Sequence, residues 1–287
     1  MAQYIAGFRD GTVAERLNLP TIRALPVAVP PLPVQRAIAH ILGTLDDKIE
    51  LNRKMNETLE QMARAIFKSW FIDFEPFRDK SMIDSPLGKI PKGWTVTPVS
   101  ELCVLSRDSL QPSAYPEEVF AHYSIPAFDE GRMPKLEPGC GILSNKLTVP
   151  EGVVLLSKLN PRIPRVWLPD VSGSARSICS TEFLVVRPNE MASREFLWRL
   201  FCDEAFVSEF STHVTGTSSS HQRVRPESLE EIRVAIPTNG TIGKFNEHVS
   251  PMLKAVSQNL HENQSLAAIR DALLPKLMSG EVSVRGT

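Results

Sequence analysis

The sequence has little excess charge of either sign and few cysteines. Its 287 residues carry 32 Lys and Arg against 33 Asp and Glu, a formal net charge of −1. This balance excludes a protein that binds polyanions with its whole surface, so any nucleic-acid surface must be local. The four cysteines lack metal-binding spacing, which is typical of a reduced, cytoplasmic protein with structural thiols. They are Cys103, Cys140, Cys179 and Cys202.

Several functional signatures are also missing. No apolar run approaches membrane length and no signal peptide is recognisable, so we expect no membrane association. There is no phosphate-binding loop and no glycine fingerprint for a nucleotide or methyl donor. His213 and His221 share one region but lack the cysteines or carboxylates of a zinc site. We therefore expect no catalytic residues, no metal site and no cofactor in this chain.

The strongest pattern present is an internal repeat. Residues 25–70 and 232–277 run in parallel without a gap, at a constant offset of 207 residues. Each copy has the pattern of a short strand, a proline break and a long helix. A long helix duplicated on either side of a globular stretch predicts a spacer rather than a catalytic site.

Both predicted helices carry an apolar seam with alternating steps of four and three residues, which is typical of a coiled coil. In the first copy the seam runs through positions 38, 42, 45, 49, 52, 56, 59, 63, 66 and 70, and in the second it lies 207 residues later. Arg270 is the one clear break in the stripe.

The centre of each seam holds two asparagines. If the helices pack antiparallel, these side chains meet in one layer, where a slip in register leaves amides unpaired at about 1–3 kcal/mol per group. The alternative is that the amides face water at the edge of a looser bundle. We predict that the register is fixed by Asn52, Asn56, Asn259 and Asn263.

Between the helices, residues 92–236 form the only large globular unit. Apolar runs at 152–156 and 183–186 predict buried strands, and 193–214 predicts a helix with Ser193 as its N-cap. The proline- and glycine-containing stretch 76–91 is typical of a linker. The predicted fold class is an α/β (α+β) domain plus two long helices that form an antiparallel coiled coil.

Several segments resemble the specificity (S) subunits of type I restriction–modification systems. PPLPVQRAIA at 30–39, LDDKIELN at 45–52 and FKSWF at 67–71 resemble the central conserved region of that family. LGKIPKGW at 87–94 is similar to the opening of a target recognition domain, and residues 216–232 are similar to its closing segment. The resemblance covers nearly the whole chain.

The resemblance implies a non-catalytic DNA-recognition subunit. In that family, two target recognition domains each read half of a split site on double-stranded DNA. Two conserved helices set their separation and dock the methyltransferase (M) subunits, which the restriction (R) subunit joins. S-adenosylmethionine and ATP with Mg²⁺ would bind to those partners. The expected organisation is a remnant of a first recognition domain at 1–30, a spacer helix at 31–75, a linker at 76–91, a target recognition domain at 92–236 and a second spacer helix at 237–287.

The chain departs from the family pattern because most of the first recognition domain is absent, as expected of an N-terminally truncated subunit. Two interpretations remain open. The chain directs methylation and restriction to DNA, or it is an assembly remnant or half-subunit that only dimerises or binds M subunits. The missing motifs disfavour a stand-alone enzyme.

Two segments have the residue types that contact DNA phosphates and base edges. Residues 158–165 follow a predicted buried strand, and two prolines stiffen them. Residues 215–225 supply a glycine, hydroxyls and cations. The alternative for each is a polar surface loop. The predicted DNA contacts are Lys158, Asn160, Arg162, Arg165, Thr217, Ser218, Ser219, His221, Gln222, Arg223 and Arg225.

Overall fold

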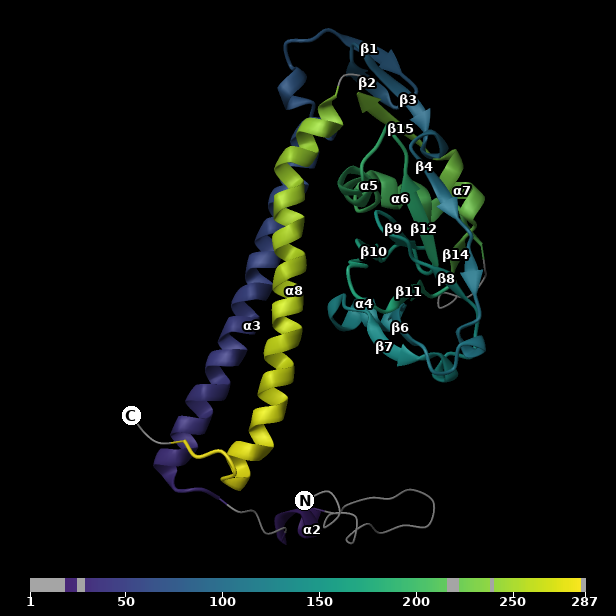
Figure 1. The fold of residues 1–287 in the computed structure, drawn as a ribbon. Helices are drawn as coiled ribbons and strands as arrows, with labels where there is room; N and C mark the ends of the chain where they lie inside the picture. The colour runs from purple at the N-terminus through teal and green to yellow at the C-terminus, as the bar shows by residue number, and fades with distance from the viewer. Residues whose placement is uncertain (1–18, 25–28, 216–221, 238–239, 285–287) are drawn as a thin grey trace. The chain divides into compact units, whose positions relative to one another are not determined.

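The protein was analysed as a computed structural model, which describes residues 19–24, 29–215, 222–237 and 240–284 (Figure 1). The contact pattern divides the chain into two compact parts, residues 1–49 with 265–287 and residues 50–264. The long helices α3 (Leu32–Phe67) and α8 (Thr241–Ser279) run through both parts, and the short helix α2 (Leu19–Ala24) precedes them. The mixture of helix and sheet agrees with the predicted fold class.

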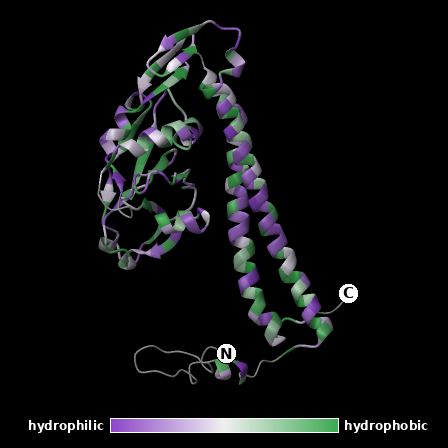
Figure 2. Cartoon of the chain, turned by 180° about the vertical axis from the view of Figure 1, so that it is seen from behind, coloured by the Kyte–Doolittle hydropathy of each residue, from purple (hydrophilic) through white to green (hydrophobic). Residues whose placement is uncertain are grey.

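The two long helices pair antiparallel. Within residues 50–264, Asn52 contacts Asn263, and the ring of Phe67 lies 5.9 Å from that of Phe245. Every predicted seam position on both helices is buried or half-buried, which confirms the heptad pattern. Figure 2 shows hydrophilic and hydrophobic bands alternating along both helices, as expected of an amphipathic pair.

The break in the seam at Arg270 has a local explanation. In the part formed by residues 1–49 and 265–287, the Arg270 guanidinium donates to Asp46 across 2.8 Å and to Asp271 across 2.9 Å. The charged head thus lies at the edge of the helix pair, while the stem covers apolar surface.

The two helices lie within the segments 31–75 and 237–287. The first ends at Phe67, where a π-helical turn (Lys68–Ile72) follows and Phe74 then takes a left-handed backbone conformation with φ 54°. The second begins at Thr241 and ends at Ser279, where Gly280 at φ 77° terminates it.

Two sheets make up most of the globular domain. The four-stranded sheet has the order β10-β9-β12-β4 and is antiparallel throughout. Its strands are β4 (Cys103–Ser106), β9 (Val154–Ser157), β10 (Val166–Trp167) and β12 (Phe183–Pro188). All four residues of β9 and the first four of β12 are buried, as their apolar runs predict.

The five-stranded sheet has the order β5-β8-β11-β6-β7, in which only the β11–β6 pair is parallel. Its strands are β5 (Ser109–Leu110), β6 (Val119–Tyr123), β7 (Lys135–Pro138), β8 (Lys146–Thr148) and β11 (Arg176–Cys179), and helix α4 (Ile125–Gly131) lies between β6 and β7 in the chain. Strand β3 (Trp94–Pro98) pairs with β15 (Arg233–Pro237), which joins the two ends of the globular stretch.

Two local predictions were wrong. The stretch 76–91, expected to be a linker, contains the hairpin β1 (Met82–Ser85) and β2 (Gly88–Pro91), whose turn uses Gly88 at φ 94°. The single helix predicted at 193–214 is two helices, α5 (Arg194–Phe201) and α6 (Glu204–Thr212). Ser193 caps the first as predicted, and Asp203 caps the second, so that a new helix starts within the apolar stripe.

One aromatic cluster lies where the helix pair meets the globular domain. Within residues 50–264, the Phe67 ring lies 5.8 Å from Phe196 of α5, and Phe71 lies 5.3 Å from Phe245 of α8 and 5.9 Å from Trp94 of β3. The helix ends and the domain therefore share one apolar core.

Candidate nucleic-acid interface

The first predicted DNA segment is the loop of a β-hairpin. Residues 158–165 connect β9 to β10, which pair antiparallel. Inside the loop, the Ile163 amide donates to the Asn160 carbonyl across 2.9 Å, and Asn160 takes a left-handed conformation with φ 49°. Asparagine tolerates this conformation better than most residues. The loop therefore contains a hydrogen-bonded turn at residues 160–163.

The second predicted segment lies beside the first. Its described part begins at Gln222 and forms β14 (Arg223–Val224), which pairs with β13 (Val214–Thr215). The Asn160 amide donates to the Gln222 carbonyl across 2.9 Å, and the Val224 amide donates to the Lys158 carbonyl across 3.0 Å. Two segments chosen separately from the sequence thus form one surface.

The cations of this surface fall into two groups. Arg223 is bound to Glu182, and Arg165 is bound to Asp129 through two hydrogen bonds of 2.7 and 2.9 Å. Among the described residues no ion pair is found for Lys158, Arg162 or Arg225, which are half-exposed to exposed. The second group can reach a phosphate without first breaking an ion pair.

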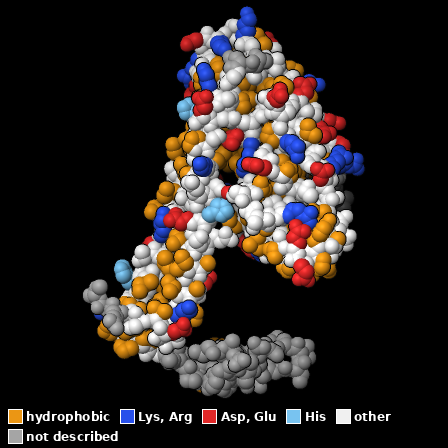
Figure 3. Space-filling model, viewed as in Figure 1, with side chains coloured by type: hydrophobic (Ala, Val, Ile, Leu, Met, Phe, Trp, Pro, Cys, Tyr) orange, Lys and Arg blue, Asp and Glu red, His pale blue; other side chains and the backbone are white. Residues whose placement is uncertain are grey.

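Four predicted contacts, Thr217, Ser218, Ser219 and His221, lie outside the described residues. Arg107, which follows β4, contacts Glu227 at 3.3 Å. Figure 3 shows basic and acidic side chains interspersed over the face drawn, in keeping with the near-zero net charge. The face drawn therefore shows no broad basic area of the kind that binds polyanions without selectivity.

Sequence reasoning did not identify Glu182 as part of this surface. It lies in the turn before β12, where its amide donates to the Ser180 hydroxyl across 3.2 Å and its carbonyl accepts from the Lys158 amide across 2.9 Å. The pairing of β12 with β9, with Phe183 opposite Ser157, brings Glu182 beside the loop. No sequence pattern links it to Arg223, which lies 41 residues further along the chain.

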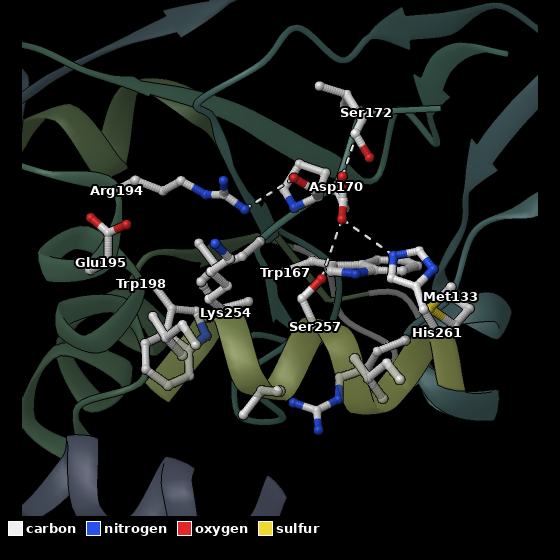
Figure 4. A pocket seen from close by; sticks show the side chains of 18 of the residues that line it. Met133, Trp167, Asp170, Ser172, Arg194, Glu195, Trp198, Lys254, Ser257 and His261 are labelled. Carbon is white, nitrogen blue, oxygen red and sulfur yellow. Dashed lines mark hydrogen bonds and ion pairs between the residues drawn. The ribbon is translucent and has the colours of Figure 1, made fainter. Parts of the chain in front are cut away.

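A separate cavity of about 530 Å³ lies between loop 167–172, the start of α5 and α8 (Figure 4). The Asp170 carboxylate contacts Ser257 at 3.3 Å and His261 at 3.2 Å, and both residues are on α8. In a Ser–His–Asp triad the imidazole stands between the serine and the carboxylate. Here the carboxylate stands between the other two, so the arrangement ties a loop to a helix.

Electrostatics support this structural interpretation. Hydrogen bonds, foremost from the Ser172 side chain and then from its amide and His261, lower the pKa of the Asp170 carboxyl to about 2. On the opposite wall, Arg194 donates to the Pro169 carbonyl across 3.0 Å, and burial lowers the pKa of its guanidinium. Mixed charges and no excess of one sign line the cavity.

Two further findings concern only the residues that the structure describes. No group of three or more His, Cys, Asp or Glu side chains is placed to hold a metal ion. Within the same ranges, every helix is too short or too polar to cross a bilayer.

Comparison with known proteins agrees with the resemblance seen in the sequence. The model of the type I restriction modification DNA specificity domain matches residues 3–61. The type I restriction enzyme MjaIX specificity subunit of Methanocaldococcus jannaschii is 28% identical over 295 residues, covering 99% of this chain and 67% of the relative. The HindI specificity subunit of Haemophilus influenzae is 26% identical, covering 97% of this chain and 73% of the relative. Over nearly its whole length, the chain is therefore similar to the specificity subunits of type I restriction enzymes.

The fold is similar to that of a solved structure. The type I restriction–modification S subunit of M. genitalium matches with a TM-score of 0.56 and 15% identity, covering 96% of this chain and 69% of that one. At this identity the likeness extends to the fold alone. Both relatives are named as specificity subunits, the non-catalytic subunits of type I restriction enzymes, which agrees with the expectation of a non-catalytic chain.

The match to the family model does not include the predicted DNA contacts. Residues 3–61 include most of α3 but neither the 158–165 loop nor the segment after residue 215. The predicted contacts therefore rest on residue chemistry and on the geometry described above.

Proposed function

We propose that this specificity subunit reads part of a split site on double-stranded DNA and directs methyltransferase and restriction subunits to it. Methyl transfer and cleavage belong to those partners, which bind S-adenosylmethionine and ATP with Mg²⁺. The globular domain supplies recognition, and the paired helices supply the spacer and the partner-docking surface. Such a complex works in the cytoplasm, where its DNA is found.

The observation that carries the proposal is the union of the two loop segments. They come from positions more than 50 residues apart, yet backbone hydrogen bonds of 2.9 and 3.0 Å join Asn160 to Gln222 and Lys158 to Val224. Such bonds fix the spacing of the side chains between them. Cationic and amide side chains held at fixed spacing are suited to contacting phosphates and base edges in a DNA groove.

The side chains of this surface contact different parts of the DNA according to their chemistry. Lys158, Arg162 and Arg225, for which no ion pair is found among the described residues, contact phosphates and set the affinity. Asn160, Gln222 and Arg223 have the hydrogen-bonding groups that distinguish base edges. Arg165 forms an ion pair with Asp129 of α4 and so holds the loop against that helix.

In the helix pair, asparagine contacts fix the register of α3 against α8. The Asn52 amide donates to Asn263 across 2.9 Å, and Asn259 donates to Asn56 across 2.8 Å. Because Asn52 and Asn56 are at most 3% exposed, a shifted register leaves them without partners. A fixed register keeps the spacer at one length.

Co-expression with a cognate methyltransferase subunit, followed by mapping of methylated bases in host DNA, tests the proposal. A split or palindromic motif is the expected result. Loss of that motif in a Lys158→Ala/Arg162→Ala/Arg225→Ala variant that still co-purifies with its partner would assign recognition to this surface. A stable complex that methylates nothing would instead favour an assembly protein or half-subunit, since the chain spans about two thirds to three quarters of the two relatives named above.

A further inference from the structure

Arg223 is held by a carboxylate at the centre of the candidate interface. Its Nε donates to the Glu182 Oε2 across 2.9 Å, and its Nη2 donates to Oε1 across 2.9 Å. This two-point contact fixes the plane of the guanidinium as well as its position. The carboxylate also raises the pKa of Arg223, which stays charged.

The carboxylate is itself held in place. The Glu182 carbonyl accepts from the Lys158 amide, and the Glu182 amide donates to the Ser180 hydroxyl. The side chain of Glu182 is 24% exposed and that of Arg223 is 43% exposed. The acid is therefore the inner partner and the arginine is the outer one, with part of its surface open to solvent.

Among the described residues, no hydrogen bond is found at the second edge of the guanidinium. A guanidinium has five N–H donors on two forked edges. Glu182 occupies the edge formed by Nε and Nη2, so the edge formed by Nη1 and the second Nη2 hydrogen points away from it. The same fork of donors matches the O6 and N7 acceptors of guanine in the major groove.

We propose that Glu182 is a positioning residue that presents Arg223 to a guanine in the recognised half-site. This inference rests on the proposed function of the domain. A carboxylate beside DNA repels phosphates, so Glu182 lowers affinity for every duplex. Its benefit lies in discrimination, because an arginine held in one plane cannot swing to a neighbouring phosphate.

Binding of duplexes by the complex with its methyltransferase subunit tests this role. The probes are a duplex with the methylated motif, the same duplex with one G·C pair of the half-site changed, and a scrambled duplex. Glu182→Gln is expected to bind the scrambled duplex more tightly than the parent, and to lose about tenfold or more of its preference for the motif. If the ion pair were merely structural, Glu182→Gln would keep the preference for the motif.

Glu227→Gln is the matched control, because it removes the same charge from the single 3.3 Å contact with Arg107. It is expected to bind all duplexes slightly more tightly without changing the preference. Arg223→Lys should lose the preference as well, because lysine has no fork, and the double variant Glu182→Gln/Arg223→Lys should lose no more than Arg223→Lys alone.

The two proposals fail in different ways. If the parent complex binds all three duplexes alike, the proposed recognition function itself is wrong. If the parent prefers its motif and Glu182→Gln keeps that preference, only the role of Glu182 is wrong. If Glu182→Gln weakens binding to all duplexes equally and lowers the melting temperature, the pair merely supports the fold and the inference is overturned.

Discussion

The Asn52 side-chain amide donates to the Asn263 carboxamide oxygen across 2.9 Å, although the two residues lie 211 positions apart in the chain. The same amide also donates to the Glu262 carboxylate across 2.7 Å. Asn52 is fully buried, so its polar atoms depend on α8 for partners. A polar pair in an apolar seam favours one register over its neighbours at some cost in stability.

This pair makes a prediction about substitutions at Asn52. Asn52→Leu leaves the Asn263 oxygen without its donor, so we expect the free energy of unfolding to fall by about 1–3 kcal/mol, measured by urea denaturation. The double variant Asn52→Leu/Asn263→Leu should recover much of this loss. If Asn52→Leu alone is as stable as the parent, the amides do not fix the register.

The two arginines of the 158–165 loop provide a matched test of DNA contact. Arg162→Ala removes an exposed cation and should weaken duplex binding, lower the salt slope of binding by about one, and leave the melting temperature unchanged. Arg165 is 12% exposed and bound to Asp129, so Arg165→Ala should lower the melting temperature. Equal salt slopes for the parent and Arg162→Ala would remove Arg162 from the interface.

The seam of the helices was predictable because its contacts follow from a repeating local pattern. Positions seven residues apart on one helix face the same partner, so periodicity alone identified the buried residues. Strands β9 and β12 were predictable for a similar reason, since each is a continuous apolar run. The hairpin at 82–91 was missed because its strands are mostly exposed and its prolines and glycine are typical of linkers.

The partners of the cations were not predictable. Asp129 and Glu182 meet Arg165 and Arg223 only because the sheets bring distant segments together. Sequence reasoning treated all the loop cations alike, whereas the fold commits Arg165 and Arg223 to ion pairs. The ion-paired cations can be told from the other loop cations only when the order of the strands is known, and the pattern of a single sequence does not give that order.

The Asp170 contacts predict a pH dependence. The unfolded chain has an Asp pKa near 3.8 and the folded protein holds it at about 2, so the unfolded state binds more protons between these values. This contribution to stability is present above pH 4 and is lost as the pH falls towards 2. In acid denaturation, Asp170→Asn should show a shallower loss of stability than the parent across that window. Identical curves would show that the contact is absent in solution.

The cysteines predict a reactivity order. Cys140 is exposed, Cys103 and Cys179 are buried and Cys202 is half-buried. Removal from solvent raises the pKa of the last three thiols to about 12. Because the thiolate is the reactive form, we expect one thiol to react quickly with a disulfide reagent near pH 8 in the native protein. All should react after unfolding in denaturant. Cys140→Ser should abolish the fast phase, and a fast phase that survives this change would contradict the assigned burial.

The loops at the candidate interface are joined through their backbones, by the amides of Asn160 and Val224 and the carbonyls of Gln222 and Lys158. Backbone groups are the same in every residue except proline. At Lys158, Gln222 and Val224 these bonds therefore do not depend on the identity of the side chain, whereas the left-handed backbone of Asn160 restricts the choice there. If the domain reads DNA as proposed, substitutions at Lys158 or Gln222 would alter the contacts made while the joined loops keep their geometry.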